Sequence, residues 1–189
     1  IERQWEEIEA AREATNVDIL RGTESDILAD GALDYPDWLL EKLDVVIMRI
    51  PNRYRQDSAA MTRRLVRAIR PPVTKIWGHP LGRLLRERPP VECDMEAVLE
   101  ALVGSNTIVE LNGDPKRMDL PPAWARRAAA LGVEFVVSAD AHAAVEMRYV
   151  ANAVSLARRV GLGPERVVNT RSAEAFRARV KPGDLVARS

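Results

Sequence analysis

The chain has 189 residues and a mass of 21.1 kDa, enough for one domain with a hydrophobic core. With 47% hydrophobic and 30% charged residues, its composition excludes a disordered chain, a collagen-like fibre and a disulfide scaffold. Because 28 basic residues balance 28 acidic ones, no overall charge attracts nucleic acid or membrane, and any DNA contact requires a local patch. The single cysteine excludes an internal disulfide and predicts no disulfide-linked partner. No signal peptide or membrane-spanning run is evident, so a cytoplasmic protein is predicted.

Strands and helices are predicted to alternate along the chain. In chain order, the predicted elements are a surface helix at 1–14, a strand at 17–27, a short helix after 34–37, a strand at 44–50, a helix at 57–70, a strand at 74–79, a helix at 94–103, a strand at 107–112, a helix at 121–131, a strand at 134–140, a helix at 145–160, a short strand at 167–169 and a helix at 172–179. Such alternation is typical of parallel βα units. The sequence therefore predicts an α/β fold of about five units, in an open sheet or part of a barrel.

Polar side chains gather where these strands end, which is the edge that carries functional residues in parallel α/β folds. The residues at these ends are Glu24, Asp26, His79, Asn112, Asp140 and His142. Carboxylates and imidazoles that converge from separate strands are ligands for zinc, manganese or iron. Structural alternatives remain open, since Asp140 is also suited to capping the following helix and His142 to an exposed first turn. Glu24 is harder to explain structurally, because a carboxylate in an apolar strand needs a partner.

Arginines cluster in two places along the chain. Four of them, Arg63, Arg64, Arg67 and Arg70, share one predicted helix and are interpreted as a solvated helix face. The loop after His79 holds the second group, Arg83, Arg86 and Arg88. Because this loop lies on the predicted catalytic side, Arg83 and Arg86 are the predicted substrate-binding residues, suited to a phosphodiester.

Four segments together resemble the PHP (polymerase and histidinol phosphatase) domain at the C-terminus of bacterial family X DNA polymerases. They are GTESDILADGALDYPDWLLEKLDVV, KIWGHPLGRLL, VELNGDPKRMDLPP and VSADAHA. The resemblance implies a distorted seven-stranded (βα) barrel that holds up to three manganese or zinc ions and hydrolyses phosphodiesters as a 3′-5′ exonuclease. Residues 1–189 would be its C-terminal portion, without the N-terminal strands. The polymerase domains, with their magnesium and their DNA, would then lie upstream of residue 1.

Matched position by position, the resemblance implies that Glu24, His79, Asp140 and His142 are metal ligands. Two departures oppose a full metal cluster. The family's opening His-x-His strand, with the Asp and His after it, is absent. Where the family reads Ser-Val-His-Ser-Arg-Phe, residues 49–54 read Arg-Ile-Pro-Asn-Arg-Tyr, so Pro51 stands at a metal-binding histidine's position and has no side-chain donor. Arg49 adds a positive charge there if it points inward, which further disfavours metal binding.

Three functions follow from this pattern. The domain is a metal-dependent phosphoesterase within a DNA repair polymerase, a non-catalytic scaffold that contacts DNA, or a free-standing phosphatase acting on a small phosphate ester. The degenerate Pro51 position favours impaired hydrolysis within a family X polymerase. We also expect that residues 1–189 alone do not fold stably, because an incomplete barrel exposes a sheet edge.

Overall fold

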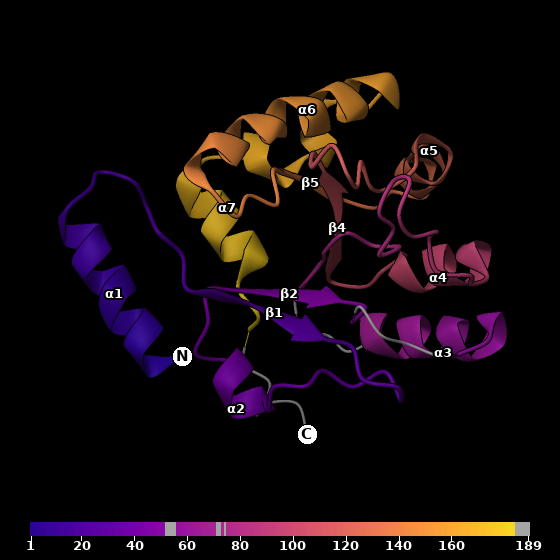
Figure 1. Ribbon diagram of the computed structural model, residues 1–189, viewed down its shortest axis with the longest axis horizontal. Coiled ribbons are helices and arrows are strands. Elements are labelled where there is room, and N and C mark those ends of the chain that lie inside the picture. Colours follow the sequence, from indigo (N-terminus) through magenta and orange to yellow (C-terminus); the bar gives the residue numbers. More distant parts are fainter. Residues whose placement is uncertain (52–55, 71–72, 74, 184–189) are drawn as a thin grey trace.

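The computed structural model describes residues 1–51, 56–70, 73 and 75–183. Five parallel strands form one sheet, in which they lie in the order of the chain (Figure 1). They are β1 (Gly22–Asp26), β2 (Val45–Arg49), β3 (Lys75–Trp77), β4 (Thr107–Asn112) and β5 (Phe135–Ser138). Helices lie between consecutive strands, so the predicted α/β fold is confirmed. The number of strands in a complete barrel stays a prediction.

Most helices begin and end close to where the sequence predicts. The α-helices of the described residues are α1 (Glu2–Glu13), α2 (Asp37–Leu40), α3 (Ser58–Ile69), α4 (Met95–Leu102), α5 (Pro122–Ala130), α6 (Val150–Arg159) and α7 (Ala173–Val180). The side chains of Asp57 and Asp94 start α3 and α4, because each accepts a hydrogen bond from a backbone N–H in the first turn. Within the described residues, no helix has the length and apolar character needed to cross a membrane.

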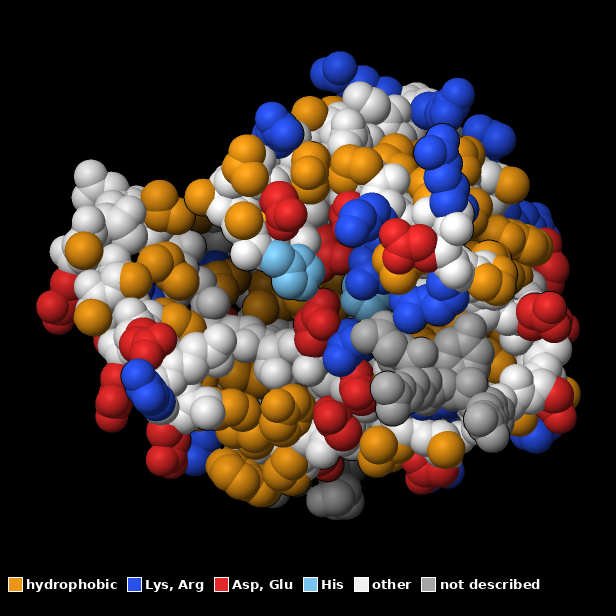
Figure 2. Space-filling model, in the orientation of Figure 1, with side chains coloured by type: hydrophobic (Ala, Val, Ile, Leu, Met, Phe, Trp, Pro, Cys, Tyr) orange, Lys and Arg blue, Asp and Glu red, His pale blue; other side chains and the backbone are white. Residues whose placement is uncertain are grey.

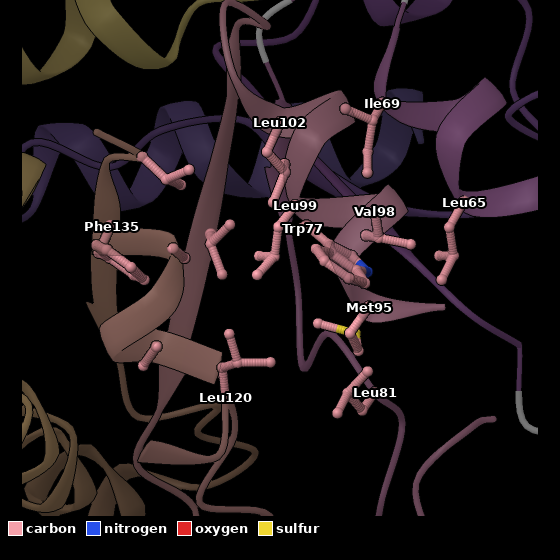
Figure 3. Packing of buried hydrophobic residues seen from close by; sticks show 14 of the residues in the cluster. Leu65, Ile69, Trp77, Leu81, Met95, Val98, Leu99, Leu102, Leu120 and Phe135 are labelled. Atoms are coloured by element: carbon pink, nitrogen blue, oxygen red, sulfur yellow. The ribbon is translucent and has the colours of Figure 1, made fainter. Parts of the chain in front are cut away.

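Helices α3, α4, α5 and α6 cover one face of the sheet (Figure 1). The strand residues that point to this layer are Met48, Trp77, Val109, Leu111 and Phe135. Figure 3 shows Trp77, which is fully buried, among Met95 and Val98 of α4. Burial of these apolar side chains holds the helices on the sheet.

The opposite face of the sheet is apolar toward the amino ends of the strands and polar toward their carboxyl ends. Its apolar part consists of Ile47, Ile76, Ile108 and Val136, and Phe176 and Val180 of α7 pack against it. Ile76 lies between Ile47 and Ile108 in the register of neighbouring strands. Because side chains alternate along a strand, residues two positions further on share this face. The face therefore continues into Arg49 of β2 and Glu110 of β4.

The predicted strand at 167–169 is wrong. Val167 makes only a single bridge to Phe135, and Val168–Thr170 is a short 3₁₀ turn, η3. The Asn169 side chain explains the difference, because it accepts from Val137 N at 2.8 Å and donates to Val137 O at 3.0 Å. The Asn169 side chain thus takes both hydrogen-bonding groups of the Val137 backbone, which a further strand would otherwise pair with. The predicted helix at 145–160 is also divided, into a 3₁₀ turn η1 (Ala144–Tyr149) and α6.

Candidate functional site

The carboxyl ends of the five strands meet in one polar site. Figure 2 shows the two histidines of the chain on one face, beside a hollow and among acidic and basic side chains. His79 follows β3 and is only 4% exposed, and its Nε2 lies 3.6 Å from Oε1 of Glu24 on β1. The structure therefore brings together two of the predicted metal ligands, Glu24 and His79, from separate strands.

Arg49 points into this site. Register places it opposite Asp26, on the face that also carries Glu24. Its Nε lies 3.1 Å from Glu24 Oε2 and 3.0 Å from Asp26 Oδ1. Two residues later, Pro51 is half-buried and offers no ligand atom. Residues 52–55, which complete the divergent segment after β2, lie outside the described residues.

Neighbouring groups favour the charged form of Glu24. The polar contact with His79 lowers the pKa of Glu24 most, and the positive charges of Arg49 and Arg117 lower it further. Burial acts in the opposite direction but does not outweigh them. Glu24 therefore stays an anion that is already neutralised by the protein's own cations.

Asp140 and His142 do not join the pair of Glu24 and His79 directly. Asp140 Oδ2 lies 2.8 Å from Nε of Arg117 and accepts from Asn112 Nδ2 at 3.0 Å. The exposed His142 ring instead has its Nδ1 2.8 Å from the carbonyl oxygen of Asp140. Its backbone N–H donates to Glu146 at 2.7 Å. His142 thus lies at the outside of the site, with contacts typical of an exposed residue at the start of a helical turn.

Glu110 and Arg117 are two members of the site that the sequence interpretation missed. Glu110 is 6% exposed; its Oε2 accepts from the His79 N–H and from Asn112 Nδ2, and its Oε1 accepts from the Ser138 hydroxyl. A glutamate within the apolar strand at 107–112 is the same signal that identified Glu24. Arg117 had no comparable signal, since it lies in a loop whose direction only the folded chain defines.

Arg83 connects two loops through its guanidinium group. It donates from Nε to the carbonyl of Arg117 at 2.8 Å and from Nη2 to that of Met118. Its Nε also lies 3.3 Å from Oδ1 of Asp119. Burial raises the pKa of Asp119 to about 6, although the charge of Arg83 and a hydrogen bond from Leu81 N–H oppose this rise. Arg83 therefore joins two loops; its predicted role in substrate binding stays a prediction.

The predicted solvated face of α3 is wrong for one of its four arginines. Arg64 is 5% exposed, whereas Arg63, Arg67 and Arg70 are exposed. The Arg64 guanidinium donates to the carbonyl of Ile27, from Nε at 3.1 Å and also from Nη2. Its burial is compensated by these hydrogen bonds to the Ile27 carbonyl, just beyond the end of β1, because a buried carbonyl needs a donor.

The residues present do not fit a cluster of three metal ions. Among the described residues, no group of three or more His, Cys, Asp or Glu side chains is placed to hold a metal. The carboxylates of the site are Glu24, Asp26, Glu110, Asp119 and Asp140, and its guanidinium groups are those of Arg49, Arg83 and Arg117. These groups leave at most about two negative charges, whereas three divalent ions would add about six positive ones, an imbalance that disfavours occupancy.

Comparisons with known proteins agree with the predicted resemblance. The chain is 35% identical over 185 residues to the DNA polymerase/3′-5′ exonuclease PolX of Bacillus subtilis, a match that covers 97% of this chain and 32% of that protein. It is 30% identical over 167 residues to a probable phosphatase of Caldanaerobacter subterraneus, covering 82% of this chain and 62% of the phosphatase. A probable phosphatase of a Thermoanaerobacter species is 29% identical, with 82% and 64% covered.

These similarities confirm the resemblance to the PHP domain that PolX-type enzymes carry, over nearly the whole chain. No family model matches the chain. The chain spans about a third of the length of PolX and about three fifths of that of the phosphatases.

Proposed function

We propose that this PHP-type domain serves a DNA-acting protein of the family X polymerase type, and that its own metal-dependent hydrolysis of phosphodiesters is impaired. The observation that carries the proposal is the Arg49 guanidinium, whose Nε lies 3.1 Å from Glu24 and 3.0 Å from Asp26. A fixed cation supplies the positive charge that a metal ion would bring to these carboxylates. It supplies neither a Lewis acid nor an activated water, which hydrolysis of a phosphodiester requires.

Pro51 and Arg117 support the same proposal. Pro51 has no donor at the position where the resembling family has a histidine, so a ligand is lost beside Arg49. Arg117 pairs with Asp140 at 2.8 Å, so a second predicted ligand is also held by a guanidinium. Manganese or zinc stays the proposed metal for any binding that the domain retains, and magnesium is proposed for the polymerase part.

DNA is the proposed partner because PolX, to which 97% of the chain is similar, is a DNA polymerase and a 3′-5′ exonuclease. Within that proposal, the domain acts as a scaffold that contacts DNA when its hydrolysis is lost. Similarity to probable phosphatases favours a second candidate, a phosphatase that acts on a small phosphate ester.

The test is manganese-dependent degradation of 3′-end-labelled single-stranded DNA by the full-length protein. We expect the wild-type protein to release label no faster than its His79→Ala variant. An Arg49→Ser/Pro51→His double variant restores the missing ligand position and removes the competing cation, so we expect it to gain activity. Label release by the wild-type protein that His79→Ala abolishes would contradict impaired hydrolysis. Hydrolysis of p-nitrophenyl phosphate without any action on DNA would favour the phosphatase candidate instead.

A further inference from the structure

Two loops at the mouth of the site are joined into one rim, formed by residues 82–88 after β3 and residues 114–118 after β4. Leu85 N–H donates to the carbonyl of Lys116 at 2.6 Å. The backbone-directed donors of Arg83 add a second connection between the same loops. Figure 2 shows basic side chains gathered beside the two histidines. The loops therefore hold their side chains in a defined place relative to the site.

Arg86 lies at the tip of the first loop in an unfavourable backbone conformation. Leu84 and Arg88 exchange backbone hydrogen bonds of 2.9 and 2.8 Å, which close a tight turn around it. Its φ is 69°, in the left-handed region that favours glycine. The other non-glycine residues of the described chain with positive φ are His79, Met118 and Asp140, which all belong to the site or its loops. Backbone strain of this kind gathers at functional sites.

Arg86 and Lys116 present their side chains to solvent. Both residues are exposed, and among the described residues neither side chain has a hydrogen-bond or ion-pair partner. Lys116 is held only through its backbone, whose N–H donates to Asp114 Oδ1 at 2.9 Å. Glu87 follows Arg86 in the turn, so the rim is not wholly basic.

The cations inside the site are paired, whereas Arg86 and Lys116 of the rim have no partner among the described residues. Inside, the guanidinium groups of Arg49 and Arg117 are paired with carboxylates, and that of Arg83 binds carbonyls and Asp119. Among the described cations of these two loops, those of Arg86 and Lys116 remain available to an outside anion. A ligand with a single phosphate gains little from them while it occupies the site. A strand with several phosphates is able to contact both at once.

We propose that Arg86 and Lys116 bind the phosphate backbone of a single nucleic-acid strand where it leaves the site, and that this rim selects a strand over a small phosphate ester. This inference rests on the proposed function, in which DNA is the partner. Two unpaired cations on joined loops match the regular negative charges of a strand. Binding of the strand by its guanidinium would explain why an arginine occupies a position whose backbone conformation favours glycine.

The test compares Arg86→Gly and Lys116→Gln with the wild-type full-length protein, using fluorescence anisotropy of a labelled oligothymidylate. Arg63→Gln is the matched control, because Arg63 is also an exposed arginine and lies on α3, outside the two loops of the rim. We expect each rim variant to bind about fivefold more weakly at moderate salt, and the control to bind as wild type. Each rim variant should also reduce the slope of log affinity against log salt by about 0.7.

Arg86→Gly separates binding from folding. Glycine relieves the positive φ, so the melting temperature should stay the same or rise while affinity for the strand falls. Weaker binding together with a lower melting temperature would indicate damage to the loop and would count against the inference.

Hydrogen–deuterium exchange gives a local readout that other DNA-binding parts of the protein do not mask. The oligonucleotide should protect residues 84–88 and 114–118, whereas inorganic phosphate at the same phosphate concentration should not. Protection of these two segments that stays unchanged in both rim variants, or equal protection by phosphate alone, would overturn the inference and leave DNA binding intact. A wild-type protein that does not bind the oligonucleotide at all would overturn the proposed function as well.

Discussion

Replacement of Arg49 by serine tests whether this arginine takes the place of a metal ion's charge. In the wild-type protein its guanidinium lies between Glu24 and Asp26, at 3.1 and 3.0 Å. Serine removes the cation and leaves two carboxylates on one face of β1 with no charge between them. We expect the variant to lose stability in the presence of a chelator and to recover it when manganese is added.

The magnitude follows from two partly exposed ion pairs. The side chains of Arg49, Glu24 and Asp26 are 25%, 41% and 31% exposed, so solvent screens both pairs. Each such pair contributes up to about 1 kcal/mol, and the variant should lose about 1 to 2 kcal/mol of unfolding free energy. Manganese at a concentration about 100 times its dissociation constant would return about 2.7 kcal/mol. The metal therefore compensates for the lost arginine.

Urea denaturation of the full-length protein, with EDTA and with manganese, measures the loss and the recovery of unfolding free energy. Arg12→Ser is the control, because Arg12 also pairs with two carboxylates, Glu9 at 2.6 Å and Asp44 at 3.2 Å. Arg12 donates to the Ile19 carbonyl as well, so this variant should lose at least as much stability, and it should recover none with manganese. Equal manganese stabilisation of the wild-type protein and Arg49→Ser would refute the reasoning, since Arg49 would then not compete with a metal.

Three further predictions concern the fold that holds the site. Burial lowers the pKa of Lys75 from 10.5 to about 8, so between these pH values Lys75 is protonated in the unfolded chain and neutral in the folded one. The free energy of unfolding should therefore rise by about 3 kcal/mol from pH 8 to 10.5. Urea titrations at each pH should show this rise in the wild-type protein and not in Lys75→Met. Arg64→Leu should lower the free energy of unfolding by about 1 to 3 kcal/mol, because it leaves the Ile27 carbonyl without the Arg64 donor. Arg63→Leu, at an exposed position, should leave it almost unchanged. Equal losses in the two variants would contradict this account. Gly113→Ala should lower stability by about 3 kcal/mol in the same assay, because a Cβ there meets the backbone of η1 and of α6; unchanged stability would mean that these elements do not pack so closely.

Part of the site was predictable because strand ends meet at one edge of a parallel sheet. Glu24 and His79 are brought together from β1 and the end of β3, as this rule predicts. The rule does not predict how loops fold beyond the strands. Arg117 reaches Asp140 only because its loop is joined to residues 81–83, which lie more than thirty positions earlier in the chain. No local pattern encodes such a contact.

The sequence by itself determined the alternation of strands and helices, since apolar runs and capping side chains act over a few residues. The resemblance places Pro51, which lacks a ligand atom in any fold, at a histidine position, and this correspondence stays a prediction. Only the tertiary structure decided which arginines are free. Register turns Arg49 toward two carboxylates, Arg64 is buried against the carbonyl of Ile27, and Arg86 stays exposed at the tip of its loop. The reason is physical: a guanidinium pairs with whichever anion or carbonyl the fold places within about 3 Å, and that distance joins residues far apart in the chain.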